Sequence, residues 1–332
     1  MANELENYLL DDYRNVVDYC DKVWRSGLAG FPPAMVTCAI TGGNHGKDAN
    51  PNLPETIDEQ VESATEAYKA GAVMIHIHAR NPENLKEMSW DPEVLIEVNR
   101  KIREKCPDEI INNSNVMGRD VIPSTMEMLH RTQIAEARAE VGSFDISNFF
   151  SQVKMPPKEP GGEPWVMDRG YFMTFTDLVD GVKLMREKGI KPEFECFAMS
   201  DLHYINWLVN HKILDPVKDG PIWIQFVYTM GSNWNTPEYM SLLKQVAPRG
   251  SMLGIIATGA QQWPLLAQAL IHGLHVRVGF EDSVYIDKGV KADSNAQFVD
   301  RIVQLAKLLG RPVATVEQAR KMLGLGAPRT WK

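Results

Sequence analysis

The chain has 332 residues, of which 44% are hydrophobic and 23% are charged, a composition typical of a soluble globular protein. Its formal net charge of −8 argues against nucleic acid or an anionic membrane surface as the main partner. Every apolar run is shorter than the roughly 18 residues that a membrane span requires, so we expect no membrane partner.

The chain contains four cysteines, and none of them forms a C-x-x-C pair. Cys38 and Cys196 lie inside apolar, strand-like runs, so we expect both to be buried thiols. Sparse, unpaired cysteines in a long chain indicate a reducing compartment. Because the acidic N-terminus also lacks a hydrophobic signal core, the sequence favours a cytoplasmic location.

The first 32 residues are polar and acidic before they become aromatic and basic around Lys22–Arg25. We interpret 1–32 as an N-terminal extension that contains a helix over 7–26, packed on the outside of a catalytic domain. That domain spans 33–325, and 326–332 form a C-terminal tail.

Strand-like apolar runs alternate with helical patterns along the rest of the chain. Thr56 and Glu59 form a capping box at the start of the first helix, and Gly71 ends it. We expect strands at 34–41, within 71–80, at 110–115, within 140–148, and at 192–198, 221–228, 251–258 and 275–280. We expect helices at 56–70, 91–106, 123–131, 175–188, 201–211, 237–246, 261–272 and 294–309.

Eight strand-helix units of this kind predict parallel pairing with crossover helices. Asn-Gly and Asp-Gly hairpin signals do not separate paired runs, which also favours parallel pairing. At this length the pattern fits an α/β fold of the (β/α)8 TIM barrel type. A doubly wound open sheet is the competing fold, but the first strand does not lead into a G-x-G-x-x-G helix start.

The stretch 71–80 reads as a buried strand that ends in two histidines, His76 and His78. Side chains two residues apart in a strand point to the same face, about 6–7 Å apart, so both imidazoles can reach one divalent metal. The pair ends an apolar run and precedes a loop, which places it at the carboxyl end of the strand. An isolated pair is nevertheless also compatible with core or surface histidines.

Chemistry in a barrel of this type takes place at the carboxyl ends of the strands, where this sequence gathers polar residues. The last strand runs from Arg277 into Glu281 and Asp282. Glu281 is a suitable third ligand for a two-histidine zinc site, Asp282 can serve as a general base, and Arg277 suits a carboxylate or phosphate. The alternative is a solvated turn with Arg277 in a surface ion pair. Other polar residues at expected strand ends are Thr41, Asn44, Asn113, Ser114, Ser143, Asn148 and Glu195.

Three other histidines lie near expected strand or helix ends. His45, in the loop after the first strand, is either a substrate contact or an exposed residue. His272 ends a helix, where a cationic group is favourable, and we do not assign it to a metal. His275 begins the last strand at the end opposite the expected site, so we interpret it as structural.

Four segments of the chain resemble the β-keto acid cleavage enzymes, a family that includes 3-keto-5-aminohexanoate cleavage enzyme. The segments are Val36–Gly42, Asn52–Pro54, Ile75–Arg80 and His275–Asp282. The resemblance covers roughly 34–325, and the His-x-His and Arg-Val-Gly-x-Glu-Asp motifs are more specific together than either is alone.

The resemblance implies a zinc-dependent barrel that condenses a β-keto acid with acetyl-CoA and releases acetoacetate and a new CoA thioester. It places the metal ligands on His76, His78 and Glu281. It places the base on Asp282 and the active-site arginine on Arg277. Members of the family are usually oligomeric, so it also implies a homo-oligomer, either a dimer or a tetramer.

The resemblance implies substrate contacts as well. Ser114 matches the serine that helps to hold the substrate carboxylate, and Ser143 matches a polar residue of the fourth strand. In the loop after the first strand the family has a glutamate that contacts a substrate amine. Asn44 stands at that position here, so the resemblance does not extend to a cationic amino substrate.

Two further functions remain open on the residues alone. The first is a metal-dependent aldolase or hydrolase that uses the same barrel without CoA. The second is a non-catalytic binding protein in which the polar cluster forms a ligand pocket.

Overall fold

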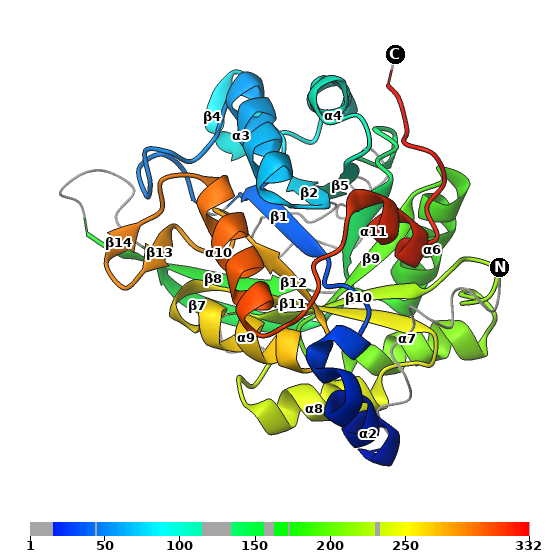
Figure 1. The fold of residues 1–332 in the computed structure, drawn as a ribbon. Helices are drawn as coiled ribbons and strands as arrows, with labels where there is room; N and C mark the ends of the chain where they lie inside the picture. Colours follow the sequence, from blue (N-terminus) through cyan, green and yellow to red (C-terminus); the bar gives the residue numbers. More distant parts are fainter. Residues whose placement is uncertain are drawn as a thin grey trace.

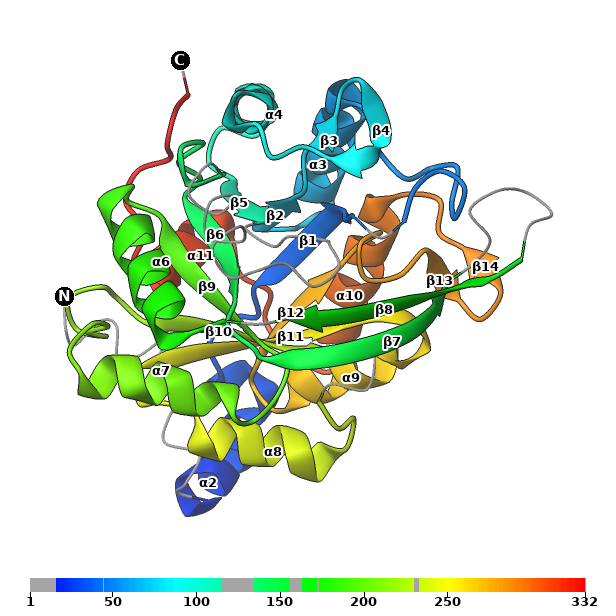
Figure 2. The same cartoon turned by 180° about the vertical axis from the view of Figure 1, so that it is seen from behind.

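The computed structural model describes residues 16–43, 45–114, 134–155, 163–171, 173–229 and 233–331. Eight parallel strands close into a barrel in the order β1-β12-β11-β10-β9-β6-β5-β2 (Figures 1 and 2), which confirms the predicted (β/α)8 fold. The barrel strands are β1 (Val36–Thr41), β2 (Met74–Ile77), β5 (Ile110–Ser114), β6 (Val141–Asp145), β9 (Lys191–Cys196), β10 (Ile222–Tyr228), β11 (Ser251–Ala257) and β12 (His275–Val278).

Helices surround the barrel and connect successive strands (Figure 1). The predicted helix at 123–131 lies outside the described residues, and a helix at the C-terminal side, α11 (Val316–Leu323), was not predicted. The helices between or after barrel strands are α3 (Ile57–Ala70), α4 (Pro92–Lys105), α6 (Phe175–Glu187), α7 (Asp201–Asn210), α8 (Pro237–Val246), α9 (Gln262–Ile271, preceded by the short 3-10 helix Gly259–Gln261) and α10 (Asn295–Leu308).

Local signals fix the ends of the first barrel helix, α3, as predicted. The Thr56 hydroxyl accepts a hydrogen bond from the Glu59 backbone N–H, and the Glu59 carboxylate accepts one from the Thr56 N–H. Gly71 follows the helix with a φ of 110°, a left-handed conformation that glycine adopts without steric cost. The chain therefore turns directly from α3 into β2, the strand that carries His76.

Three antiparallel ribbons, which the sequence analysis did not predict, lie in loops outside the barrel sheet. The shortest strands carry too few residues to show a period of two, and Asn84–Met88 is exposed or half-buried throughout, so it lacks an apolar face. Figure 2 shows the longest ribbon, β7 and β8, as a separate pair of strands. The ribbons are β3 (Arg80–Asn81) with β4 (Asn84–Met88), β7 (Phe149–Met155) with β8 (Trp165–Tyr171), and β13 (Tyr285–Asp287) with β14 (Val290–Lys291).

The two ends of the chain are built differently. The described part of the N-terminal extension forms α2 (Val16–Ser26) and a 3-10 turn (Gly27–Gly30), and Trp24 is 89% exposed on it. The C-terminal segment is tied to the barrel, because the Arg329 side chain donates to the carbonyl of Ala139 and the Trp331 indole N–H donates to the carbonyl of Ala137.

The interior of the barrel changes from apolar to polar along the strands. Large apolar side chains fill it near the amino ends, which we call the base. Two residues further along six of the eight strands, on the same inward face, the side chain is polar or absent. A buried polar layer thus separates the base from the carboxyl ends, which we call the mouth. The base residues include Met35, Met74, Ile110, Val141, Trp223 and Met252, and their successors are Thr37, His76, Asn112, Ser143, Gln225 and Gly254.

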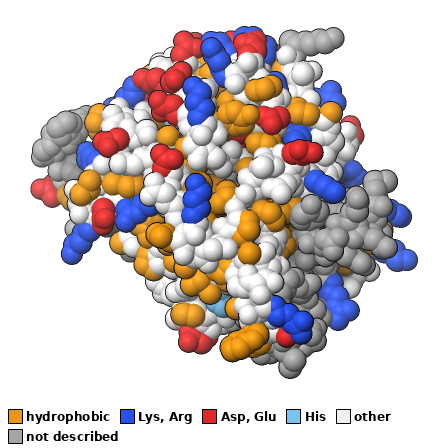
Figure 3. Space-filling view, viewed as in Figure 1, with side chains coloured by type: hydrophobic (Ala, Val, Ile, Leu, Met, Phe, Trp, Pro, Cys, Tyr) orange, Lys and Arg blue, Asp and Glu red, His pale blue; other side chains and the backbone are white. Residues whose placement is uncertain are grey.

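On the face shown in Figure 3, basic and acidic side chains are intermixed, as is usual for a surface in contact with water. Cys38 and Cys196 are buried free thiols, as predicted. Within the described ranges, each helix is too short or too polar to cross a lipid bilayer.

Candidate active site

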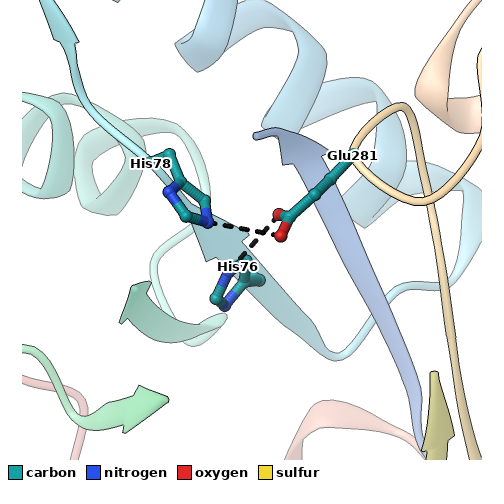
Figure 4. A group of neighbouring side chains, drawn as sticks. All are labelled: His76, His78 and Glu281. Atoms are coloured by element: carbon teal, nitrogen blue, oxygen red, sulfur yellow. Dashed lines mark ion pairs between the residues drawn. The ribbon is translucent and has the colours of Figure 1, made fainter. Parts of the chain in front are cut away.

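Three side chains from distant parts of the chain converge at the mouth of the barrel. Nε2 of His76 lies 3.4 Å from Oε2 of Glu281, and Nε2 of His78 lies 3.3 Å from Oε1 of the same carboxylate (Figure 4). The two imidazole rings have centroids 5.1 Å apart. One potential ligand atom from each residue lies within 4.8 Å of the others, a separation that fits three ligands around one cation.

Two glycines give the Glu281 side chain its position. Gly279 has a φ of 137°, and a Cβ there would lie 2.2 Å from the carbonyl oxygen of Ala39. The chain therefore turns sharply after β12, and the Glu281 N–H donates to the Ala39 carbonyl at 3.3 Å. A Cβ at Gly42 would lie 2.6 Å from Cγ of Glu281, so glycine is required where β1 passes the carboxylate.

The protonation states of His76 and Glu281 suit a metal cation. Burial holds the pKa of His76 well below its ordinary value, so this imidazole is neutral near pH 7. Burial opposes ionisation of Glu281, but the positive charge of Arg277, together with its contacts with the two imidazoles, holds its pKa well below the usual range. Oε2 of Glu281 is buried and accepts no hydrogen bond from the described residues. Two imidazole nitrogens and one carboxylate are a typical ligand set for zinc with an open position.

Arg277 lies beside this cluster and contacts three carboxyl groups. Its Nη2 is 2.7 Å from Oε1 of Glu281, and its Nη1 is 3.3 Å from Oε1 of Glu195. It also holds both oxygens of Asp282, with Nε 3.1 Å from Oδ2 and Nη2 3.0 Å from Oδ1. This bidentate contact fixes the plane of the Asp282 carboxyl group. The guanidinium is 3% exposed, so it is engaged with the protein and is not a surface ion pair.

The environment of Asp282 raises its pKa to about 6. Burial is the main cause, the charge of Glu281 acts in the same direction, and Arg277 opposes both. A carboxylate with this pKa is mostly ionised at neutral pH and binds a proton more strongly than an exposed aspartate does. These properties are those of a general base for a weakly acidic C–H group.

Glu195 and Asp145 form a buried acidic pair on the neighbouring strands β9 and β6. Burial raises the pKa of Glu195 well above its usual range, and the charge of Asp145 raises it further. Glu195 was predicted to lie at a strand end, but no role was predicted for it. Its contact with Arg277 depends on which residues of separate strands face inward at the same height, and the sequence of one strand alone does not contain that information.

The remaining predicted substrate residues have different positions. Ser114 ends β5 and is paired in register with Ser143 of β6. Ser143 is fully buried, and its hydroxyl has no hydrogen-bond partner among the residues that the structure describes. Asn44 lies outside the described residues. His45 is half-buried, and burial lowers its pKa.

Arg80 is a site residue that the sequence analysis treated only as part of a loop signal. It is 3% exposed, and its Nη2 donates to the hydroxyl of Thr41 at 3.2 Å and to the carbonyls of Gly42 and His45. The guanidinium therefore joins the segment after His78 to the segment after β1. In the sequence, its position two residues after His78 was the signal that could have identified it as a site residue.

A model of the family described as beta-keto acid cleavage enzyme matches residues 33–325. The chain belongs to this family. It is 34% identical to the 3-keto-5-aminohexanoate cleavage enzyme of Fusobacterium nucleatum, over 88% of this chain and 97% of that protein. It is 33% identical to the 3-oxoadipate:acetyl-CoA acetyltransferase of Cupriavidus necator, over 88% of this chain and 95% of that protein.

Among solved structures, the barrel is similar to that of ObcA in its binary complex with oxaloacetate. The TM-score is 0.64 at 19% sequence identity, and the match covers 83% of this chain and 68% of that chain. This likeness concerns the fold, and it agrees with the closed eight-stranded barrel described above.

Proposed function

We propose that this protein is a zinc-dependent transferase that converts a β-keto acid and acetyl-CoA into acetoacetate and a new CoA thioester. The single observation that carries the proposal is the convergence of His76, His78 and Glu281 beside an Asp282 held by Arg277. The name of the Cupriavidus necator relative supports acetyl-CoA as the co-substrate. Family membership supports cleavage of a β-keto acid.

His76, His78 and Glu281 would hold the metal, which would act as a Lewis acid toward the β-keto oxygen. The protein supplies the geometry around it. His76 and His78 present Nε2 to the same carboxylate, and both side chains are buried. The Nδ1 of His78 lies 3.1 Å from the thioether sulfur of Met88, so the β3–β4 ribbon covers the outer side of this imidazole.

Asp282 is the proposed base for the proton on the carbon between the keto group and the carboxylate of the substrate. Arg277 orients both of its oxygens, so the carboxylate loses little rotational freedom when it accepts the proton. Its pKa of about 6 keeps it mostly ionised at neutral pH. Arg277 is thus a positioning residue for the base.

Ser114 and Ser143 are the proposed contacts of the substrate carboxylate. They are neighbours in register on β5 and β6, and the buried hydroxyl of Ser143 lacks a partner among the described residues. A hydroxyl can donate one hydrogen bond to a carboxylate oxygen. We propose that the substrate occupies the polar layer between these serines and His76.

The test is formation of a CoA ester from acetyl-CoA and each of several β-keto acids. The panel contains 3-keto-5-aminohexanoate, 3-oxoadipate, 3,5-dioxohexanoate and 3-dehydrocarnitine, the compounds in the names of the relatives. We expect acetoacetate and a new thioester in equal amounts, with activity lost on chelation and restored by Zn²⁺. Turnover that proceeds equally well without acetyl-CoA would instead identify an aldolase or hydrolase.

Metal analysis of variants tests the site itself. We expect about one zinc per chain in the unaltered protein and a large loss in His76→Ala and in Glu281→Ala. Unchanged metal content in both variants, with the fold intact, would refute the metal site. Binding of a β-keto acid without any turnover would favour a binding protein.

A further inference from the structure

Asn112 lies beside His76 in the polar layer of the barrel. The two residues are paired in register on the adjacent parallel strands β5 and β2, so their side chains share the inward face. Asn112 is fully buried, and it is two residues before Ser114 on the same strand. On β5 it comes two residues after Ile110, which belongs to the base of the barrel, and the function proposed above gives it no role.

The orientation of the Asn112 amide is fixed by its partners. Nδ2 donates to Oε1 of Glu193 at 2.9 Å and lies 3.5 Å from the sulfur of Met74. A carboxylate and a thioether accept hydrogen bonds, so the NH₂ group must face them and Oδ1 must face away. Oδ1 is therefore an acceptor that faces away from Glu193, and it belongs to the residue paired in register with His76.

The atoms on both sides of this contact have no competing partner. Nδ1 of His76 and Oδ1 of Asn112 are both buried, and neither has a hydrogen-bond partner at ordinary distance among the described residues, so each is available to the other. A histidine that ligates a metal is a neutral imidazole, so only one of its nitrogens carries a hydrogen. An acceptor opposite Nδ1 places that hydrogen on Nδ1 and leaves a lone pair on Nε2, the atom that faces Glu281.

Glu193 anchors Asn112 from β9, which is two strands away from β5 in the barrel. Its Oε2 accepts hydrogen bonds from the indole N–H of Trp223 and, at 3.4 Å, from Nε2 of Gln225. Glu193 is fully buried on β9, and both donors are on β10. The carboxylate thus accepts from three side chains on two strands and cannot turn without breaking several hydrogen bonds.

We propose that Glu193 and Asn112 form a relay that holds His76 in the Nδ1–H tautomer and directs its Nε2 lone pair to the metal position. Partners of this kind orient a ligating histidine and increase its basicity. Asn112 and Glu193 are positioning residues in this relay, which rests on the metal site proposed above. Without the relay, His76 could place its hydrogen on Nε2, and the tautomer would have to change before a cation could bind.

The first experiment compares Asn112→Ala with Asn113→Ala by chelator competition for Zn²⁺. Asn113 is the next residue on β5 and is equally buried, but it faces outward and forms two hydrogen bonds with Asn99. We expect the Zn²⁺ dissociation constant to rise about 10- to 100-fold in Asn112→Ala and to stay within about threefold in Asn113→Ala. Equal effects in the two variants would overturn the proposal, because a general loss of packing would explain them.

A second variant exchanges donor and acceptor across the relay. In Asn112→Asp/Glu193→Gln, one carboxylate oxygen at position 112 still faces Nδ1 of His76. The other oxygen accepts a hydrogen bond from the new amide at position 193, whose own oxygen accepts from the indole N–H of Trp223. We expect this double variant to recover Zn²⁺ affinity to within about threefold of the unaltered protein. The visible spectrum of bound Co²⁺ should also return to its original shape, whereas Asn112→Ala should alter it. If neither the Zn²⁺ affinity nor the Co²⁺ spectrum recovers in the double variant, the relay is contradicted.

The same measurements separate this inference from the proposed function. If His76→Ala abolishes Zn²⁺ binding while Asn112→Ala binds as tightly as the unaltered protein, the metal site stands and the relay is wrong. If the unaltered protein and His76→Ala bind Zn²⁺ equally, the metal site itself is wrong.

Discussion

The base and the mouth of this barrel both hold buried carboxyl groups against arginines, but in opposite proportions. At the base, Glu140 precedes β6 and accepts from Nη2 of Arg103 and Nη2 of Arg320, each at 2.7 Å. The backbone N–H groups of Ile111 and Arg329 complete its hydrogen bonds at 3.1 Å each. One carboxylate therefore meets two guanidinium groups, and both of its oxygens are fully engaged.

At the mouth one guanidinium, that of Arg277, meets the carboxyl groups of Glu195, Glu281 and Asp282. The neighbouring His76 is neutral, so it does not balance the excess of carboxyl groups. Burying unbalanced charge costs free energy unless a counter-charge binds. In direct ion pairs, Glu140 is thus matched by two guanidinium groups, whereas Arg277 is shared by three carboxyl groups, an arrangement that agrees with the proposed cation site.

The largest expected effect is on catalysis at the mouth. Asp282→Asn keeps the size of the side chain but removes the proton acceptor, so we expect kcat to fall by about 10²- to 10⁴-fold. Zinc content should remain near that of the unaltered protein. Steady-state rates of CoA-ester formation and metal analysis check both expectations. A kcat within about threefold of the original would rule out Asp282 as the base.

At the base, the corresponding change should affect stability. Glu140→Gln leaves Arg103 and Arg320 buried without their counter-charge, so we expect the free energy of unfolding to fall by about 3–5 kcal/mol. Denaturant titration measures this loss. The fraction that remains folded should retain its kcat, because Glu140 lies at the opposite end of the barrel. If Glu140→Gln lowered kcat without lowering stability, the base could not be distinguished from the mouth as the end that stabilises the fold.

Zinc itself should stabilise the protein through the mouth alone. At a free Zn²⁺ concentration of 100 times its dissociation constant, we expect the free energy of unfolding to rise by about 2.7 kcal/mol. Thermal unfolding with and without Zn²⁺ measures the effect. His76→Ala should abolish it, whereas Glu140→Gln should preserve it on its lower baseline. Equal stabilisation of all three proteins would locate zinc elsewhere.

A dependence on pH is also expected at the base, and over a single pH unit it is the smallest of these effects. Burial, together with the charge of Arg311, lowers the pKa of His275 from 6.5 to about 3, and its Nδ1 accepts from the Met35 N–H at 2.9 Å. Below pH 6.5 the unfolded chain binds a proton that the folded chain does not. Stability should therefore fall as the pH decreases toward 3, by up to about 1.4 kcal/mol per pH unit.

His275→Asn isolates this contribution, because asparagine keeps an acceptor near Nδ1 but does not titrate. We expect the variant to have a lower stability at every pH and a shallower decline between pH 6.5 and pH 4. Denaturant titrations at several pH values give the two slopes. Parallel slopes for both proteins would assign the acid sensitivity to other groups.

Much of the architecture could be predicted because each barrel strand is a short apolar run between helix signals. The meeting of His76, His78 and Glu281 followed from one rule, that the carboxyl ends of parallel strands share one end of the barrel. The antiparallel ribbons were missed because Asn84–Met88 and similar short segments have no buried face. The α11 helix was missed although Thr315 and Gln318 form a capping box at its start.

Cross-strand contacts could not be predicted in the same way. The partners of Arg277, the relay from Asn112 to Glu193 and the anchoring of Glu140 each join residues that are far apart in sequence. They depend on strand register, which is fixed by packing of the whole barrel. Residue type and spacing along one strand do not reveal at what height a side chain meets its neighbour.

The turn at Gly279 has a consequence for how such an enzyme can diversify. Glu281 and Asp282 are consecutive residues carried by the same short backbone segment, and Ala39 of the neighbouring strand β1 leaves no room for a side chain at position 279. The spacing between the proposed proton acceptor and the proposed metal ligand is thus set by the main chain. Loops elsewhere at the rim can be rebuilt for a new keto acid while that spacing stays constant.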